Sequence, residues 1–222
     1  ALVSGFMGAV DSANEMQRSM SRLEINAQTA GQSMTTVNDN FRQFTALTQQ
    51  ADSSAEAMSN LLQTGFDDNG LTQAVDALSG AVVQFPDTLN IESLADGLQE
   101  TLATGTATGQ FGELLDRVGV GAENFSTALA QCTTDAEKQN LVLETLAEAG
   151  LNDVWAQYEQ ANGGMLSFQD SMTLIQQSLS TLVESILPLV APAFATIAEA
   201  VSSLVTAFAE GGFAGLLEQV GS

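Results

Sequence analysis

Single glycines divide most of this sequence into runs of helix-forming residues. The runs are rich in Ala, Leu, Glu, Gln and Met, and alternation of β-branched with polar residues is sparse. A glycine after such a run favours a left-handed helix C-cap, and five positions fit: Gly31, Gly65, Gly105, Gly119 and Gly150. We therefore predict an all-α fold, with helices at about residues 2–30, 37–50, 53–64, 70–84, 91–104, 107–118, 122–132, 135–149 and 151–162, and a longer helical segment from about 165 to 209.

Two tetrapeptides mark expected helix starts. Ser53-Ser-Ala-Glu56 and Thr134-Asp-Ala-Glu137 each place a hydroxyl and a carboxylate three residues apart, which is the spacing of the capping box. Both are predicted to lie in the first turn of a helix.

The helix lengths predict three regions. Helices between residues 53 and 162 are about 11 to 15 residues long, and helices this short need tertiary packing for stability. Their apolar residues share faces, for example Leu71, Val75, Leu78 and Val82, or Leu94, Leu98 and Leu102. We predict a globular domain of short packed helices over 53–162, N-terminal helices that connect to it over 1–52, and a long Pro-interrupted amphipathic helical segment over 163–222.

The C-terminal segment carries a heptad-like seam. Its apolar residues are three or four positions apart, with one extra residue near Pro188 and Pro192, where the helix should break or kink. Two readings stay open: the two arms pack on the preceding domain, or they associate with other copies of the chain. The candidate self-association residues are Phe168, Met172, Ile175, Leu179, Leu182, Ile186, Val190, Phe194, Ile197, Val201, Leu204 and Phe208.

Charge excludes several classes of function. The chain has 27 acidic and 5 basic residues and no histidine, a formal net charge of −22. Five cations cannot form the basic surface that binds nucleic acid, or the polybasic face that binds an anionic membrane. Without histidine, the usual zinc sites and His-activated nucleophiles are absent as well. The one cysteine, Cys132, is expected to be a small buried residue in the helix over 122–132.

No motif predicts catalysis or a cofactor. Close acidic pairs such as Glu113 and Asp116 are expected by chance among so many acids. Residues 67–70 (Asp-Asp-Asn-Gly) lack the rest of a calcium loop and are expected to form a turn. Residues 105–112 are rich in glycine but lack the lysine of a phosphate loop, and fit a turn between helices. Trp155, Tyr158 and Phe168 are expected to form a small aromatic cluster. The prediction is a protein that is not an enzyme, with no catalytic, cofactor or metal site.

The termini and hydropathy suggest a section of a longer or processed chain. The sequence begins Ala1-Leu-Val-Ser4, with no methionine and no basic n-region. The most apolar stretch, residues 185–198, is too short to span a bilayer as a helix. A constitutive transmembrane helix is therefore not expected.

Several segments resemble the tape-measure proteins of tailed phages and of related phage-derived particles. They are residues 94–119 (Leu-Ala-Asp-Gly-Leu-Gln-Glu onward), 129–150 (Leu-Ala-Gln-Cys-Thr-Thr-Asp onward) and 155–162 (Trp-Ala-Gln-Tyr-Glu-Gln-Ala-Asn), followed by the helix that contains Pro188. The likeness extends over about residues 53–200. The chain is shorter than family members usually are.

The resemblance implies a structural role in the virion. Family members lie in the lumen of the tail tube after assembly in the host cytoplasm, where their length sets the length of the tail. It also implies contacts with tail-tube and tail-tip or baseplate proteins, with copies of itself (a trimer is favoured), and transiently with a membrane as the genome is delivered across the host envelope. Direct nucleic-acid binding is not expected.

Two other classes remain as alternatives. One is a secreted or cell-surface acidic helical binding module, such as an adhesin or a type VII secretion substrate, since that class also favours helices rich in Ala, Gln and Ser. The other is a cell-wall hydrolase, against which the lack of histidine and of a credible acid pair argues. The genes next to the coding sequence would separate the first alternative from a tail protein.

Overall fold

A computed structural model describes residues 17–167 and 169–170. The chain divides into two compact units, and all described residues belong to the unit over Asn14–Gln177. All twelve seam residues, from Phe168 to Phe208, lie outside the described residues, as do Pro188 and Pro192.

The described part is a globular all-α fold, as predicted, and it contains no β-strand. Helical residues 17–30 come first. The helices that follow are α2 (Met34–Thr48), α3 (Ala51–Leu62), α4 (Asp68–Gln84), α5 (Ile91–Thr104), α6 (Gly109–Arg117), α7 (Ala122–Leu129) and α8 (Asp135–Glu148). Residues 151–167 are helical again, and so are 169–170.

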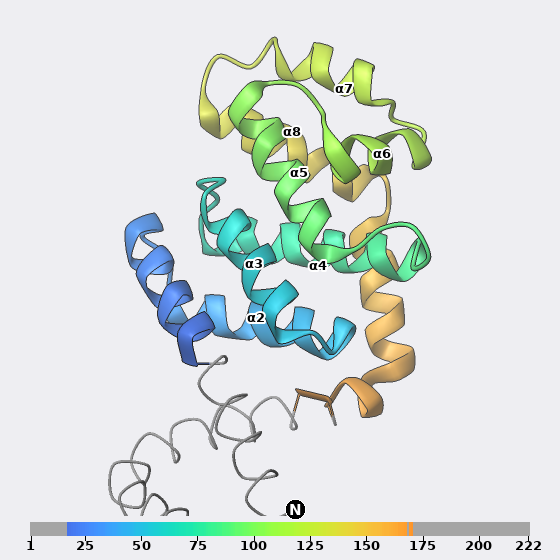
Figure 1. The fold of residues 1–222 in the computed structure, drawn as a ribbon. Helices are drawn as coiled ribbons and strands as arrows, with labels where there is room; N and C mark the ends of the chain where they lie inside the picture. Colours follow the sequence, from blue (N-terminus) through green and yellow to red (C-terminus); the bar gives the residue numbers. More distant parts are fainter. Residues whose placement is uncertain (1–16, 168, 171–222) are drawn as a thin grey trace, which may run out of the picture. The chain divides into compact units, whose positions relative to one another are not determined.

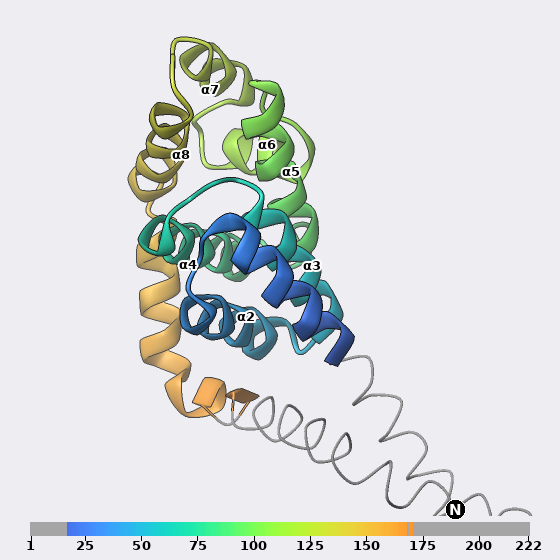
Figure 2. The ribbon, with the colours of Figure 1, turned by 90° about the vertical axis from the view of Figure 1, so that its left-hand side faces the viewer.

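The helices pack in two connected groups around α4. α2 packs on α3 and α4 at one end, α3 packs on α5, and α6 and α7 follow α5 at the other end. α4 also contacts α5 and α8 (Figure 1). The helical residues 151–167 return along the side of the unit, so that both ends of the described part lie at the α2 end, away from α7 (Figures 1 and 2).

One hydrophobic core runs through these helices. It includes residues on both sides of position 52, such as Phe41 and Phe44 of α2 beside Met58 and Leu61 of α3. The predicted faces of α4 and α5 point into it: Leu71, Leu78, Leu94 and others on these faces are fully buried. Burial of a large apolar side chain contributes about 1.5–3 kcal/mol. This core is therefore what holds the short helices in place.

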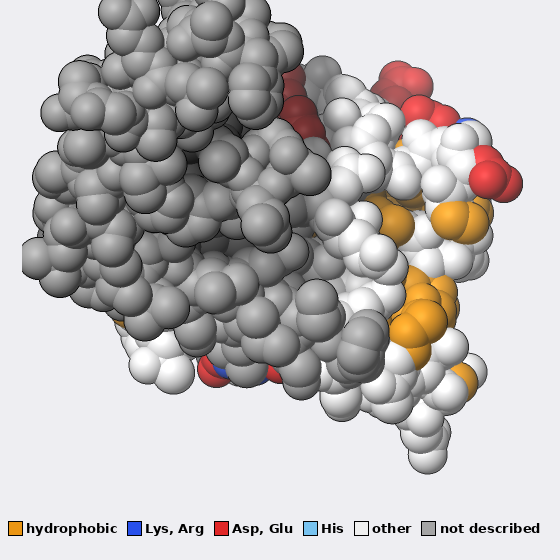
Figure 3. Space-filling model, turned by 60° about the horizontal axis from the view of Figure 1, so that its bottom comes forward, with side chains coloured by type: hydrophobic (Ala, Val, Ile, Leu, Met, Phe, Trp, Pro, Cys, Tyr) orange, Lys and Arg blue, Asp and Glu red, His pale blue; other side chains and the backbone are white. Residues whose placement is uncertain are grey.

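The surface is mostly polar. Among the described residues, the large hydrophobic side chains that are well exposed are Ile25 and Met165. On the part of the described surface that is visible in Figure 3, hydrophobic side chains form separate small patches among polar ones, and acidic groups are more evident than basic ones.

Local signals predicted several helix ends correctly. All five C-cap glycines have a positive φ, between 73° and 82°. The capping box at Thr134 is present: its hydroxyl accepts a hydrogen bond from the Glu137 amide, and the Glu137 carboxylate accepts one from the Thr134 amide. Of residues 105–112, which were expected to form a turn between helices, 105–108 join α5 to α6 and 109–112 already belong to α6.

Four local predictions were wrong. Ser53 lies inside α3, whose N-cap is Gln50, because the helix begins earlier than the sequence suggested. Asp67 is the N-cap of α4 and accepts a hydrogen bond from the Gly70 amide at 2.7 Å, so residues 68–70 start a helix instead of forming a turn. Cys132 is half-buried in the turn after α7 instead of buried within a helix. Helical structure also continues through Gly163, without the expected end at 162.

Candidate functional site

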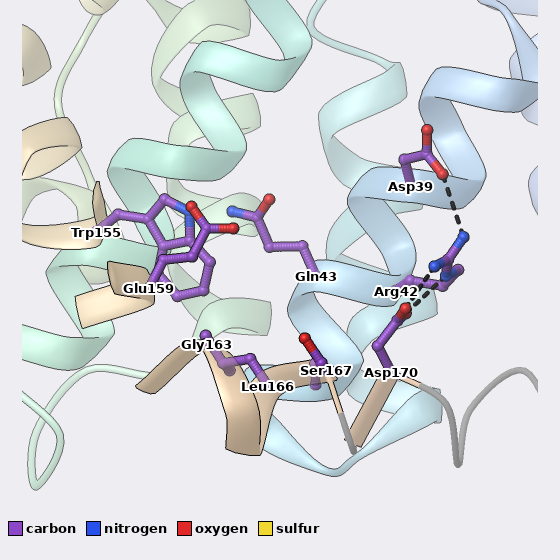
Figure 4. A pocket seen from close by; sticks show the side chains of 10 residues that line it. Asp39, Arg42, Gln43, Trp155, Glu159, Gly163, Leu166, Ser167 and Asp170 are labelled. Carbon is purple, nitrogen blue, oxygen red and sulfur yellow. Dashed lines mark hydrogen bonds and ion pairs between the residues drawn. The ribbon is translucent and has the colours of Figure 1, made fainter. Parts of the chain in front are cut away.

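The candidate site is a cavity of about 320 Å³ between α2 and the helical residues 151–167 and 169–170. α2 contributes one wall, and the other wall comes from the returning helix that the core places beside it (Figure 4). The lining residues are Asp39, Arg42, Gln43, Ala46, Trp155, Glu159, Gly163, Leu166, Ser167 and Asp170.

A two-pronged ion pair closes one side of the cavity. The Arg42 guanidinium donates from Nε to Asp170 Oδ1 at 2.6 Å and from a terminal nitrogen to Asp170 Oδ2 at 2.5 Å (Figure 4). Its other terminal nitrogen lies 3.3 Å from Asp39 Oδ1, one helical turn earlier in α2. These hydrogen bonds, together with the two negative charges, raise the pKa of Arg42 against the opposing effect of its partial burial. The guanidinium is thus held between two carboxylates.

On the side of the cavity away from Arg42, the carboxylate of Asp76 lies behind Gln43. The Gln43 amide donates to Asp76 Oδ1 at 2.9 Å and lies 3.2 Å from the Ser79 hydroxyl. Burial raises the pKa of Asp76, and the negative charge of Glu159 adds to the effect, while the Gln43 hydrogen bond opposes it. Gln43 and Glu159 lie on the same side of the cavity in Figure 4, across from Arg42.

The apolar part of the lining is a small separate cluster. Trp155, Ala46 and Leu166 are nearly fully buried together. The rings of Trp155 and Tyr158 stack with centroids 5.9 Å apart. The aromatic pair was predicted from its spacing, and Phe168, the expected third member, lies outside the described residues. This cluster fixes the returning helix against α2.

The polar groups of the cavity are largely engaged with one another. An Arg between two carboxylates and a Gln on a third carboxylate suit the positioning of helices or contact with a charged partner. Among the described residues, no group of three or more His, Cys, Asp or Glu side chains is placed to hold a metal ion.

Several acidic residues that lie close together in the sequence accept hydrogen bonds from different parts of the structure. Glu113 accepts two hydrogen bonds from Arg117 one turn later in α6. Asp116 accepts from the Ala122 amide at 2.7 Å, at the start of α7. Asp68 accepts from the Ser33 amide at 3.0 Å and so ties α4 to the start of α2. Each of these carboxylates therefore has a hydrogen-bond donor in its own part of the fold.

Sequence reasoning missed the Arg42–Asp170 contact. The two residues are 128 positions apart, so no local spacing links them. The available signal was the scarcity of cations: in a chain with five basic residues, each is expected to find an acid, but the sequence does not say which one.

No helix in the described part of the chain has the length and apolar character needed to cross a bilayer. Comparison with family models, with curated proteins and with solved structures gave no match.

Proposed function

We propose that this chain is part of a tape-measure protein of a phage or phage-derived tail, and acts as a structural component and not as an enzyme. The observation that supports it is the fold of the resembling segments. Residues 94–119 and 129–150 form α5, α6 and α8, and the two segments contribute to the same core. The segments that resemble tape-measure proteins therefore belong to one folded unit, whose helices end at glycines.

In this role the protein lies in the lumen of the tail tube and contacts tail-tube and tail-tip or baseplate proteins. Copies associate through the seam from Phe168 to Phe208, with three copies favoured. The acidic surface suits a lumen through which DNA later passes, because like charges do not retain the nucleic acid.

The test is tail length in particles that carry the full-length protein with a longer seam. Insertion of four heptads in register within residues 168–186 adds about 42 Å if they continue as a helix. Electron microscopy of the tails should show that increment. The matched control places the same insertion in the loop over residues 105–107, where it lengthens a surface loop and leaves the tail unchanged.

Two results would contradict the proposal. One is a set of tails of ordinary length in particles that mass spectrometry shows to contain the seam insertion. The other is wild-type tails that do not contain the chain at all.

A further inference from the structure

The helix over residues 17–30 has an outer face that combines positive charge with an exposed apolar side chain. Leu23 lies on its inner side and is fully buried in the core. Arg18, Arg22 and Ile25 follow one another at steps of four and three, so they share the outer side of the helix. All three are exposed, Ile25 to 64%. Figure 2 shows this helix, in dark blue, with no described segment in front of it.

The two arginines on this face are charges without a partner. Arg42, Arg117 and Lys138 each form an ion pair. Within the described part of the chain, Arg18 and Arg22 have neither a hydrogen bond nor an ion pair. Two cations on a chain with a formal net charge of −22 are too few to bind nucleic acid or an anionic membrane. The surface that they suit is an acidic face of a protein.

Helix α8 offers an acidic face with the same spacing. Glu144 and Glu148 are exposed and lie one turn apart, and among the described residues neither has a hydrogen-bond or ion-pair partner. Beside Glu144, a hollow of about 340 Å³ lies between α8 and the start of α4. Its lining includes the apolar side chains of Leu143 and Ala147 among polar groups. The face therefore has acceptors for two cations and an apolar contact next to them.

We propose that the outer face of the N-terminal helix docks on α8 of a second copy of this chain, with the two helices antiparallel. Arg18 then meets Glu148. Arg22 meets Glu144, and Ile25 lies over the hollow. These charges are not paired within one chain, so a second copy supplies the complementary face. The contact is separate from the predicted seam, and it rests on the charge and shape of this unit, not on the proposed tail function.

The test follows this contact by nuclear magnetic resonance of the full chain, with the predicted seam disabled by Leu182→Asp and Ile197→Asp. Two exposed ion pairs and one apolar side chain make a weak contact, so we expect a dissociation constant of about 1 mM. Dilution from about 1 mM to about 0.05 mM should shift amide signals on both faces, at residues 18–25 and 140–148. Salt at about 1 M should weaken the contact, whereas it should strengthen the seam.

A charge swap makes the test specific to these two faces. Arg22→Glu should raise the dissociation constant at least about tenfold, because a like charge then faces Glu144. Adding Glu144→Arg restores opposite charges and should bring the constant back to within about threefold of the starting value. Arg22→Glu with Glu123→Arg is the matched control: it has the same net charge, but the second change lies on the exposed side of α7, and the contact should stay weak.

Circular dichroism should show the same helix content in every variant. The proposal is overturned if the charge swap associates as weakly as Arg22→Glu alone, or if dilution leaves the signals of either face unchanged. Signals that respond to Arg22→Glu but not to dilution would place an acidic segment of the same chain on this face, and would overturn it as well.

Discussion

Gly80 has no room for a side chain, because α4 crosses the returning helix at this residue. A Cβ built there would lie 1.9 Å from the Leu151 carbonyl oxygen and 2.9 Å from its carbonyl carbon. Both atoms belong to the backbone, so relief requires the two helices to move apart.

We predict that Gly80→Ala destabilises the fold by about 1–3 kcal/mol, although alanine is the better helix former. Urea unfolding followed by circular dichroism measures the change. Gly164→Ala is the control, since its Cβ meets nothing, and it should be neutral or stabilise by up to about 1 kcal/mol. Equal stability of the Gly80→Ala variant and the wild type would mean that the two helices can move apart at this crossing at no cost in stability.

Asp76 makes stability depend on pH in the direction opposite to that of a salt-bridged carboxylate. Its pKa is raised in the folded state by burial, so above the ordinary aspartate pKa, about 3.9, the folded state binds more protons than the unfolded state. The free energy of unfolding therefore falls as pH rises from that value through the raised pKa.

Asp76→Asn should remove the loss of stability that the buried, charged carboxylate causes. The amide oxygen of the new side chain can still accept the hydrogen bond from Gln43. We expect the variant to be more stable than the wild type at pH 7, and this advantage to disappear below about pH 4, where Asp76 is protonated in both states. Asp96→Asn, on the exposed face of α5, controls for the change in net charge. An advantage of the same size for both variants, or one that grows in acid, would contradict the assignment.

Among the labelled helices α7 is the shortest, and like α8 it is held by only two buried residues. It spans eight residues, Ala122–Leu129, and buries only Phe125 and Leu129. The Phe125 ring packs edge-on against Phe111 of α6, with centroids 5.9 Å apart. α4, in contrast, buries nine residues between Gly70 and Ala81.

We predict that α7 opens locally before the rest of the unit. In native-state hydrogen exchange its amides should be protected much less than those of α4, whose exchange should require global unfolding. Phe125→Leu should weaken protection in α7 with little effect on α4. Equal protection of the two helices would show that α7 unfolds only with the whole unit.

The elements were predictable from sequence where their signals are local. Gly105 ends α5 and Thr134 begins α8 because a φ preference and a side-chain hydrogen bond act within a few residues. The same local reasoning failed at Gly163, where a glycine pair resembles a helix end although helical structure continues. Contacts between distant residues gave no sequence signal, which is why the Arg42–Asp170 side of the cavity and the packing at Gly80 were not predicted.

At the scale of the whole molecule, the sequence predicts that the C-terminal seam joins copies of the chain. A long apolar stripe is costly to expose, and acidic faces beside it repel at low salt. We predict an oligomer whose association strengthens as salt rises from about 0.1 to 1 M. Light scattering or native mass spectrometry of the full chain measures its mass.

Leu182→Asp combined with Ile197→Asp places a charge in each arm and should reduce the mass to that of a monomer. Gln177→Asp with Thr206→Asp adds the same charge at positions away from the predicted seam, and should leave the mass unchanged. If the first pair stays folded and keeps the wild-type mass at both salt concentrations, the seam does not join copies.

The crossing at Gly80 also has a consequence for folding kinetics. It joins two residues about 70 positions apart, and closing a loop of that length costs about 4 kcal/mol of chain entropy before any contact offsets it. The helices on either side can form earlier from local contacts. We expect the crossing to form after the rate-limiting step, so that Gly80→Ala accelerates unfolding and leaves the refolding rate nearly unchanged. Stopped-flow chevron plots measure both rates, and a slower refolding limb would place the crossing in the folding nucleus.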